Sequence, residues 1–407
     1  MNSSLASGLR NGPHGAAAPP TGSQAVARLS GSLRVTLYAE PGADRAAGIV
    51  SLFNGEPDFA TPAWICEAAT EAMRHGFTHY PLHQGDVELR ETIAELLNEQ
   101  HGLDYTRDDI LVTNGASSAI YASITALVDP GDEVVLLDPC WAGYQDAINM
   151  AGAVPVRAAL GSDFHLDPEA LDAAISPRSK MLVVCNPGNP TAVVFSRSEL
   201  EAIARIAREH DLLVLADEVY DHIVYDDRPF ISTLAVPELA ERTLLVQSFS
   251  KSYAMTGWRL GYVAAKRGRA QLAGMAHRTA LQFVNSITQR AGLAALRAKT
   301  ESEAWFRDML AVYDRRRRLG QQLLEQIPRA RSRLPEGTFY FWVKVDTALS
   351  SVELIRYLRD TGRVSVHPGT EYGPNGEGYI RLSFANAEAQ VREGIARIGE
   401  ALAKLNH

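Results

Sequence analysis

Residues 248–262, SFSKSYAMTGWRLGY, place one lysine among serines and an arginine eight residues further along. A lysine amine becomes a nucleophile at neutral pH when burial or neighbouring cations keep it unprotonated. Hydroxyl groups and a guanidinium are groups that bind a phosphate dianion. The stretch is therefore either a solvated loop after a strand, or a reactive Lys251 beside an anion site formed by Ser248, Ser250 and Arg259.

Two other predicted strand ends carry candidate functional groups. The run LLVLADEVY ends at Asp217, with Tyr220 three residues later, although a carboxylate there can equally cap the following turn. The run ILVTNG leads into Gly115, Ala116 and Ser117 before a helical pattern, and the free N–H groups at such a helix start bind anions. A lysine, an acid for a ring nitrogen and a phosphate cradle together are what pyridoxal phosphate (PLP) requires. The combination is far more specific than any one member.

Short apolar runs alternate with helical patterns between about residues 60 and 290. The patterns DILVTNG, EVVLLDP, VPVRAAL, MLVVCNP, LLVLADE, LLVQSFS and LGYVAA predict strands. SELEAIARIAREHD predicts a helix with Ser196 as its N-cap. Strands that are apolar on both faces predict an α/β fold with a mostly parallel seven-stranded sheet, covered by helices, that binds ligands beyond the carboxyl ends of its strands. The candidate groups should therefore meet at that edge.

Changes in composition and residue pattern along the chain predict four segments. We expect a disordered tail at 1–27, which is rich in Gly, Ala, Ser and Pro, and an arm with part of the small domain at 28–60. A large PLP-binding domain is predicted at 61–295. TFYFWVKV, RVSVHPG and YIRLSFA indicate a smaller α+β domain at 296–407. The arginine run at 315–318 is expected to be a solvated face of a long helix.

Composition narrows the class of protein. The 407 residues are 46% hydrophobic and 22% charged, which is typical of a soluble globular protein with two or three structural units. A net charge of -8 gives no reason to expect nucleic acid as a partner. Three widely spaced cysteines argue against a disulfide framework and a metal site, and favour the cytoplasm. No apolar run is long enough for a membrane span, and no signal peptide is visible.

From about residue 28 to its end, the chain resembles the class I/II aminotransferases, the aspartate-aminotransferase-like branch of the PLP fold type I enzymes. The motifs GEPDF, Tyr80 ahead of GDVELR, NPGNPT, ADEVY, SFSKSYAMTGWRLGY and IRLSFA occur in the family's order. The resemblance implies a PLP-dependent aminotransferase that moves an amino group between an L-amino acid and a 2-oxo acid. It implies a ping-pong mechanism through pyridoxamine phosphate, and a homodimer with shared active sites.

The resemblance also implies roles for the residues around the cofactor. Lys251 is similar to the lysine that binds PLP covalently and then moves the substrate's proton. Asp217 resembles the partner of the pyridinium nitrogen, and Tyr220 and Asn189 resemble the neighbours of the 3-hydroxyl group. Trp141, in DPCWAGY, matches the aromatic residue that stacks on the ring.

Phosphate and substrate binding are implied in the same way. Tyr80 resembles a tyrosine that reaches the phosphate bound to the partner subunit, and Arg381 resembles the arginine that clamps the substrate α-carboxylate, a task suited to a bidentate guanidinium. The phosphate cradle is matched by Gly115, Ala116, Ser117, Ser248, Ser250 and Arg259. The expected substrate-binding residues are Arg381, Asn189, Trp141, Gly55 and Asn54.

The chain also departs from the family pattern. Ala192 follows NPT where glycine is usual, which would strain the backbone if φ is positive there, and Asn54 precedes GEPDF where glycine is more usual. No second arginine can be assigned to a side-chain carboxylate of the substrate. The candidate pocket residues Leu33, Phe53, Asn54, Trp141 and Phe339 mix apolar and polar groups, so the donor and acceptor stay open.

Other activities are compatible with parts of this pattern. A β-lyase, a cyclising synthase or a PLP-dependent oxidase can share all these residues, because a fold does not fix a reaction. A non-catalytic effector-binding module is disfavoured, because the tail ahead of residue 28 is too short and too rich in Gly and Pro for a helix-turn-helix domain. A Rossmann dehydrogenase is disfavoured by the lack of a G-x-G-x-x-G motif.

Overall fold

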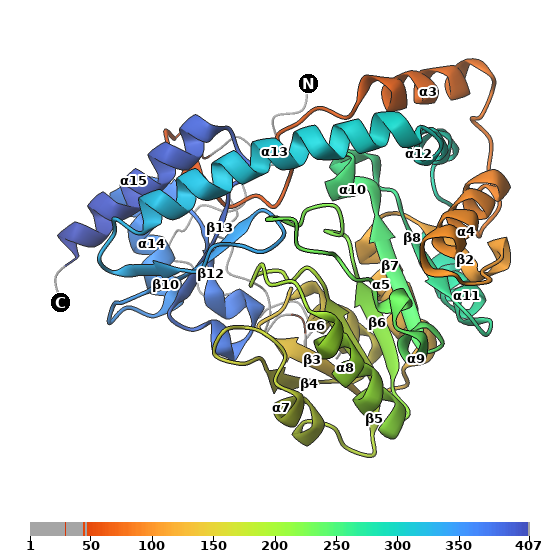
Figure 1. Cartoon of the computed structure of the whole chain (residues 1–407), viewed down its shortest axis with the longest axis horizontal. Coiled ribbons are helices and arrows are strands. Elements are labelled where there is room, and N and C mark those ends of the chain that lie inside the picture. Colours follow the sequence, from red (N-terminus) through yellow and green to blue (C-terminus); the bar gives the residue numbers. More distant parts are fainter. Residues whose placement is uncertain (1–28, 30–43, 45–46, 406–407) are drawn as a thin grey trace, which may run out of the picture.

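The computed structural model describes Leu29, Asp44 and residues 47–405 of the chain (Figure 1). The predicted tail at 1–27 and the candidate pocket residue Leu33 lie outside the described residues. Two sheet-containing parts are joined by the long helix α13 (Lys299–Leu324), which runs along both of them. The predicted boundaries at 60/61 and 295/296 stay predictions.

A seven-stranded sheet forms the centre of the larger part, with strand order β2-β8-β7-β6-β5-β3-β4. Only β8 is antiparallel to its neighbours, and the other adjacent pairs in this sheet are parallel. Every strand predicted for this sheet is present, which confirms the predicted fold class. The strands are β2 (Ile110–Thr113), β3 (Glu133–Asp138), β4 (Val154–Ala159), β5 (Ser179–Cys185), β6 (Leu213–Asp217), β7 (Thr243–Ser248) and β8 (Gly261–Ala265).

Helices cover both faces of this sheet because successive residues of its strands point to opposite sides. Leu244 packs into one apolar core and Leu245 into another. Ser196 caps α8 as predicted, accepting a hydrogen bond from the Glu199 amide at 3.3 Å. The covering helices are α3 (Ala63–Arg74), α4 (Val87–His101), α5 (Ala116–Leu127), α6 (Gly143–Ala151), α7 (Pro168–Ala173), α8 (Arg197–Glu209), α9 (Pro237–Ala240), α10 (Phe249–Ser252), α11 (Arg269–Leu281) and α12 (Ser286–Arg297), with short 3-10 turns at η1 (Arg107–Asp109), η2 (Thr233–Ala235) and η3 (Thr256–Trp258).

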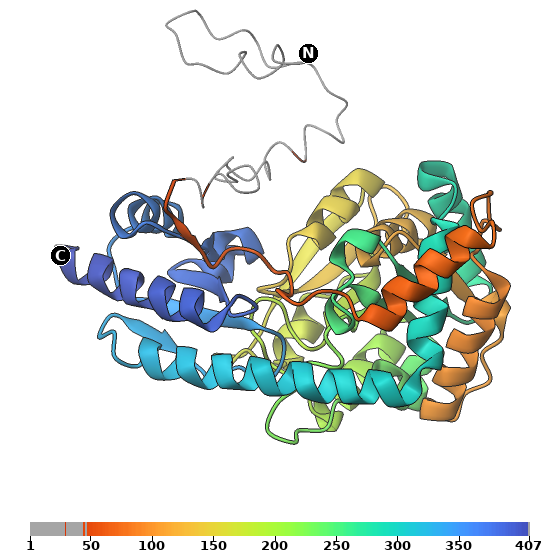
Figure 2. The same cartoon turned by 90° about the horizontal axis from the view of Figure 1, so that it is seen from above.

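The smaller part contains an antiparallel four-stranded sheet of order β12-β13-β10-β9 and the parallel pair β1-β11. A third apolar core lies between these strands and their helices. In Figure 2 the segment that follows β1 crosses from the smaller part to α3. The elements are β1 (Val50–Ser51), β9 (Ala330–Ser332), β10 (Tyr340–Val345), β11 (Val364–Ser365), β12 (His367–Pro368), β13 (Tyr379–Ser383), α14 (Ser351–Gly362), α15 (Glu388–Lys404), η4 (Gly369–Tyr372) and η5 (Pro374–Gly376).

The arginine run of α13 is not a solvated face, so that prediction was wrong for its two central members. Arg316 is buried and makes two 2.8 Å hydrogen bonds to Asp58. Arg317 is fully buried and binds Asp226 through both terminal nitrogens, at 2.8 and 2.7 Å. These carboxylates come from segments far away in sequence. Helical periodicity alone therefore cannot reveal them.

A polar junction ties η4 and η5 to the carboxyl edge of the large sheet. Arg157 of β4 donates to Asp138 of β3 at 2.6 Å and to the Tyr372 carbonyl at 3.3 Å. The Asn375 amide donates to Asp138 at 3.1 Å. Gly373, between the two 3-10 turns, approaches so closely that a Cβ there would lie 1.6 Å from Asp138 Oδ1. The loop of the smaller part is therefore fixed against the larger part.

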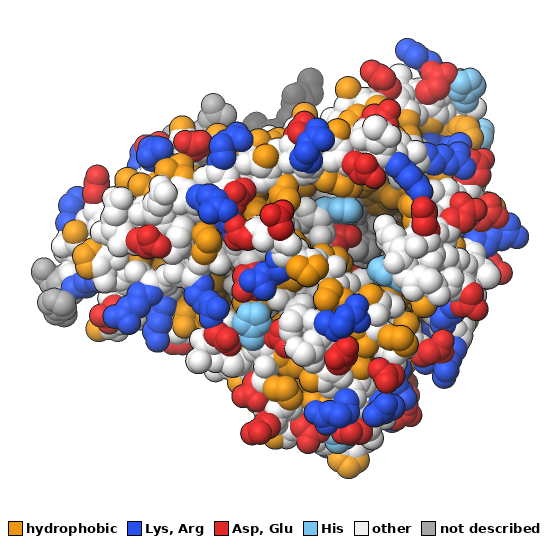
Figure 3. Space-filling model, viewed as in Figure 1, with side chains coloured by type: hydrophobic (Ala, Val, Ile, Leu, Met, Phe, Trp, Pro, Cys, Tyr) orange, Lys and Arg blue, Asp and Glu red, His pale blue; other side chains and the backbone are white. Residues whose placement is uncertain are grey.

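The surface gives fewer distinctions. On the face drawn in Figure 3, acidic and basic side chains are interspersed. Within the described ranges, none of the helices has the length and apolar character to span a bilayer. The same ranges contain no group of three or more His, Cys, Asp or Glu side chains placed to hold a metal ion.

Candidate active site

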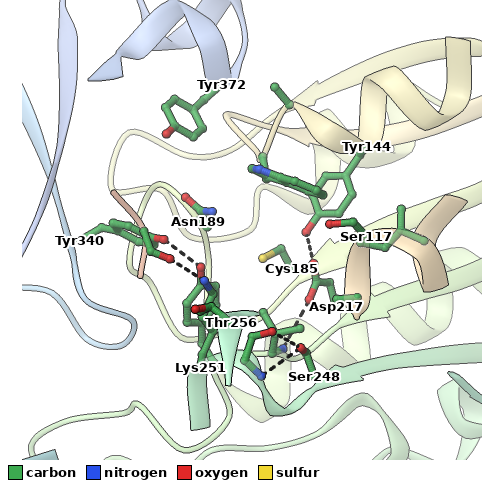
Figure 4. A pocket seen from close by; sticks show the side chains of 18 of the residues that line it. Ser117, Tyr144, Cys185, Asn189, Asp217, Ser248, Lys251, Thr256, Tyr340 and Tyr372 are labelled. Atoms are coloured by element: carbon green, nitrogen blue, oxygen red, sulfur yellow. Dashed lines mark hydrogen bonds between the residues drawn. The ribbon is translucent and has the colours of Figure 1, made fainter. Parts of the chain in front are cut away.

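A cavity of about 300 Å³ lies at the carboxyl ends of the large sheet's strands, where the small sheet faces them (Figure 4). In Figure 4 Tyr372 lies across it from Lys251 and Ser248. The predicted residues brought together around it are Gly55, Ala116, Ser117, Trp141, Asn189, Asp217, Tyr220, Ser248, Ser250, Lys251, Arg259 and Arg381.

Lys251 sits in the short helix α10, directly after β7. Its ammonium nitrogen donates a hydrogen bond to the carbonyl of Gly55. Burial lowers the pKa of Lys251 to about 8, an effect that Glu56 opposes and that Arg381 and Arg259 reinforce. Part of the Lys251 population is therefore unprotonated near neutral pH, as a nucleophilic amine requires.

Asp217 ends β6 and is buried at the base of the cavity. Tyr144 Oη donates to Asp217 Oδ2 at 2.6 Å, as drawn in Figure 4, and the Val219 amide donates to Oδ1 at 3.4 Å. Burial raises the pKa of Asp217 to about 6, while these hydrogen bonds and Lys251 oppose the rise. A buried carboxylate in this state favours a cationic N–H partner.

Tyr144 was missing from the predicted site. It lies in α6, three residues after Trp141, and the two rings meet edge to face with centroids 5.3 Å apart. Trp141 itself lies just before α6 begins at Gly143. The motif DPCWAGY contains Tyr144, so its closeness in sequence to Trp141 was the one signal that could have revealed it.

The start of α5 forms an anion-binding cradle. Gly115 precedes the helix with φ of 84°, and a Cβ there would lie 2.5 Å from Arg259 Nη2, so the guanidinium packs against bare backbone. Ser248 Oγ donates to Ser250 Oγ at 2.9 Å. Helix N–H groups, two hydroxyls and a guanidinium fit a phosphate dianion. The cradle therefore fits the phosphate of PLP, with Asp217 suited to the ring nitrogen.

Arg381 of β13 is almost fully buried in the opposite wall. It donates to Asn189 Oδ1 at 3.2 Å and to the Phe53 carbonyl at 3.0 Å, and its guanidinium carbon lies 4.1 Å from the centre of the Tyr340 ring. Its Nε is buried without a hydrogen-bond partner. Among the described residues no carboxylate lies within 4.0 Å of this guanidinium. A charged donor with spare hydrogen-bonding capacity fits a ligand carboxylate.

Tyr340 is a second residue that the sequence did not single out. Its hydroxyl lies 3.0 Å from that of Tyr220, and both side chains are buried. Burial raises the pKa of the Tyr220 phenol well above its usual value. A Cβ on Gly55 would collide with the Tyr340 hydroxyl, so glycine is required there. The pattern TFYFWVKV gave no sign of which aromatic residue faces the cavity.

Two predicted site residues do not reach this cavity within the chain. Tyr80 is 84% exposed and stacks on Phe283, with ring centroids 4.7 Å apart. Asn54 is exposed and is not part of the cavity wall. Of the candidate pocket residues, Phe339 is fully buried, with its ring centre 5.9 Å from the Lys251 nitrogen.

Ala192 stands where the family usually has glycine, and its φ is positive. Its φ is 60°, in the left-handed region that favours glycine. The carbonyl of Ala192 accepts hydrogen bonds from the amides of Glu336 and Gly337, both at 2.9 Å. These two bonds fix the strained turn in place.

Residues 47–398 match the family model described as aminotransferase class I and II. The chain belongs to this family. It is 37% identical over 361 residues to the putative aminotransferase YugH of Bacillus subtilis, covering 88% of this chain and 92% of the relative. It is 36% identical to a bifunctional aspartate aminotransferase and glutamate/aspartate-prephenate aminotransferase of Petunia hybrida, covering 87% and 76% of the two chains.

Solved structures give the same assignment. The aromatic aminotransferase of Pyrococcus horikoshii OT3 superposes with a TM-score of 0.86 at 34% identity, covering 93% of this aminotransferase and 99% of that chain. The aspartate aminotransferase of Thermus thermophilus with maleate gives 0.83 at 34% identity, covering 94% and 97%. The predictions of PLP fold type I, of PLP as cofactor and of an aminotransferase of class EC 2.6.1 are thereby confirmed.

Proposed function

We propose that three side chains of the cavity wall carry out transamination together. Lys251 provides the amine, Asp217 the acid, and Arg381 binds the substrate carboxylate. PLP, when bound, supplies an electron sink that stabilises negative charge on the substrate Cα. Lys251 Nζ would hold the cofactor through its aldehyde carbon and, once the donor's amino group has replaced it there, would take the proton from the substrate Cα. Its pKa of about 8 suits both duties at neutral pH.

Asp217 holds the proton on the ring nitrogen, and Tyr144 orients that carboxylate. The 2.6 Å hydrogen bond from Tyr144 keeps Asp217 Oδ2 in one position and favours its ionised form. Tyr220 binds the 3-hydroxyl group of the cofactor. The Tyr340 hydroxyl lies 3.0 Å from the Tyr220 hydroxyl and orients it. Trp141 stacks on the face of the cofactor ring. The phosphate is held by Ala116, Ser117, Ser248, Ser250 and Arg259, with Gly115 giving them room.

Arg381 binds the substrate α-carboxylate, and the observation that carries this role is its unpartnered Nε beside a cavity that also contains Lys251. Asn189 and the Phe53 carbonyl fix the plane of the guanidinium. A fixed carboxylate in turn aims the Cα–H bond at the lysine, which is how orientation lowers a barrier.

A homodimer with shared sites accompanies this function. Tyr80 lies among side chains that are apolar and exposed, and exposed apolar patches of this kind mark interfaces. We propose that Tyr80 contacts the phosphate site of a second copy. Phe77 and Leu82, in the same segment of the chain as Tyr80, are exposed as well. The free thiols of Cys66, Cys140 and Cys185 support a cytoplasmic location.

The half-reaction tests the activity. An amino donor added alone should convert the bound cofactor stoichiometrically to pyridoxamine phosphate, seen as loss of the yellow absorption band. Lys251→Ala should abolish turnover, and Lys299→Ala, on an exposed helix end, should leave it unchanged. Full activity of Lys251→Ala would refute the role. Recovery of the yellow band with release of ammonia would indicate a lyase or an oxidase instead.

Mixed subunits test the shared sites. A hybrid of a Tyr80→Ala subunit and a Lys251→Ala subunit contains one site with both residues intact. Mixing the two variants should therefore yield more activity than either has alone. A mixture that only averages the two activities would contradict the sharing of Tyr80.

A further inference from the structure

Glu336 lies between β9 and β10 of the smaller part and binds the larger part through its side chain and its backbone. Its Oε2 accepts a hydrogen bond from the Val194 amide at 3.0 Å, and its Oε1 accepts one from Arg228 at 3.1 Å. His165 Nε2 lies 3.5 Å from the same Oε1. The Glu336 amide donates to the Ala192 carbonyl at 2.9 Å. The reaction proposed above assigns no task to this half-buried carboxylate.

The segment that Glu336 holds is a turn that carries one of the cavity residues. Residues 186–195 connect β5 to the start of α8, and the Ala192 amide closes the turn by donating to the Gly188 carbonyl at 2.9 Å. Asn189 lies inside this turn and accepts a hydrogen bond from Arg381 at 3.2 Å. A shift of the backbone at Ala192 is therefore passed to the residue that orients the Arg381 guanidinium.

The turn is strained at Ala192 and depends on external support. A φ of 60° is unfavourable for a residue with a Cβ, and such backbone persists where its surroundings hold it. Glu336 holds the turn on both sides of the strained bond. Its amide binds the Ala192 carbonyl, and its carboxylate binds the amide of Val194, two residues later. The carboxylate thus supplies support that a glycine at position 192 would need less.

We propose that Glu336 is a positioning residue for the carboxylate clamp. Its side chain holds the Ala192 turn, so that Asn189 keeps the Arg381 guanidinium in the plane that receives the substrate α-carboxylate. Glu336 is not among the described residues that line the cavity, so it acts through the turn. A tilted guanidinium loses bidentate geometry, which weakens donor binding more than it slows proton removal by Lys251. This inference rests on the proposed role of Arg381.

Donor titration of the half-reaction separates binding from rate. Stopped-flow loss of the yellow band is followed in the holoenzyme with aspartate or phenylalanine, whichever converts the wild-type cofactor faster. Glu336→Ala should raise the apparent dissociation constant of the donor about fivefold to tenfold, and should change the limiting rate less than about twofold. Glu336→Gln keeps an oxygen acceptor for the Val194 amide and should stay within about threefold of the wild-type constant. An unchanged dissociation constant in Glu336→Ala would overturn the proposal.

Amide hydrogen exchange gives a readout that does not depend on catalysis. Because the Val194 amide loses its acceptor, residues 192–195 of Glu336→Ala should exchange at least about fivefold faster than in the wild type. Glu353→Ala is the matched control, because Glu353 accepts a hydrogen bond from the Ser350 amide at 3.0 Å at the surface of α14. It should change neither the exchange of 192–195 nor the donor constant. Unchanged exchange of 192–195 in Glu336→Ala would refute the hold on the turn.

Glycine at position 192 tests whether Glu336 opposes strain. In the double variant Glu336→Ala/Ala192→Gly the donor constant should return to within about twofold of the wild type, because glycine adopts the positive φ unaided. If Glu336→Ala alone loses the cofactor or its fold, the double variant should regain them. A double variant as impaired as Glu336→Ala would contradict the inference alone. If neither donor converts the wild-type cofactor, the proposed function fails and the inference fails with it.

Discussion

Arg317 in α13 and Arg381 in β13 are both almost completely buried, but their surroundings differ in kind. Arg317 binds Asp226 through two nitrogens, Asp314 at 2.8 Å and a backbone carbonyl at 2.6 Å. Arg381 has an amide oxygen, a carbonyl and two tyrosine rings, and its Nε has no partner. A saturated guanidinium holds the fold together, whereas an unsaturated one keeps hydrogen-bonding capacity for a ligand.

The same contrast appears between two adjacent acids. Glu218 accepts hydrogen bonds from the Thr233 amide and hydroxyl, both at 2.7 Å, and points away from the cavity wall. Asp217 faces the cavity and has Tyr144 as its side-chain donor. Burial raises the pKa of both carboxyls, to about 7 for Glu218 and about 6 for Asp217. Burial and a shifted pKa therefore do not identify a functional group, but unsatisfied capacity at a cavity does.

Of the two arginines, Arg381 should show the larger effect on catalysis, in the variant Arg381→Leu. The efficiency of the half-reaction should fall about a thousandfold, because a buried charge pair with the substrate is lost. The unfolding free energy should change little, since no carboxylate among the described residues pairs with this arginine. Arg381→Lys keeps the charge but not the bidentate geometry. Its half-reaction efficiency should lie between that of the wild type and that of Arg381→Leu. A near-normal half-reaction rate in Arg381→Leu would contradict the substrate-binding role of Arg381.

Arg317→Leu should have the opposite profile. The free energy of unfolding should fall by about 3 kcal/mol, because a fully buried guanidinium and its hydrogen bonds to Asp226, Asp314 and the Pro335 carbonyl are lost. Arg318 binds the same two aspartates at the surface, so Arg318→Leu should cost less than about 1 kcal/mol. Denaturant unfolding measures the change in unfolding free energy of both variants. The turnover of each folded variant should be unchanged. A large loss of turnover in Arg317→Leu would contradict a purely structural role.

Glu218→Gln should change the pH dependence of stability. The folded pKa of about 7 exceeds the usual 4.5, so the folded protein binds more protons in this window, and the stability is present below pH 4.5 and is lost as pH rises through 7. The variant cannot ionise, so its unfolding free energy relative to the wild type should rise by about 1–2 kcal/mol between pH 5 and 8. A constant difference across this range would show that Glu218 does not titrate there.

Tyr144→Phe should have a smaller effect on catalysis than Arg381→Leu. Loss of the hydrogen bond should slow the half-reaction about fivefold to tenfold, by releasing one charged contact. Because that bond opposes the rise of the Asp217 pKa, the acid limb of the pH profile should move to higher pH. Tyr105→Phe removes a buried hydroxyl that has no hydrogen-bond partner and should leave the profile unchanged. An unmoved acid limb in Tyr144→Phe would contradict the link to Asp217.

The sequence predicted the parts of this aminotransferase that local patterns determine. Each strand of the large sheet is an apolar run that ends in small or polar residues, so both its place and its functional end could be predicted. Lys251 and Asp217 lie at strand ends where their residue types suggested a chemistry, whereas Arg381 was assigned only through the resemblance to the family, and all three roles stay predictions. Ser196 was predictable as a cap because capping depends on residues three apart.

What could not be predicted depends on contacts between distant segments. Tyr340 lies in a run of four aromatic residues, 339–342, and only its approach to Tyr220 distinguishes it. The pairing of Arg316 with Asp58, 258 residues away in the chain, turns an expected surface run into core. Tyr80 and Asn54 stay predictions, because within one chain neither lies at the cavity.

The close contact of Gly373 with Asp138 limits how the substrate specificity of this enzyme can be redesigned. A library that randomises the η4–η5 loop would place most side chains at position 373 onto a carboxylate oxygen of β3. Such clones would fail by losing the attachment of the loop, not by lacking a suitable pocket. A productive library would therefore keep Gly373, Asp138 and Arg157 constant and vary positions of the loop that line the cavity, such as Glu371.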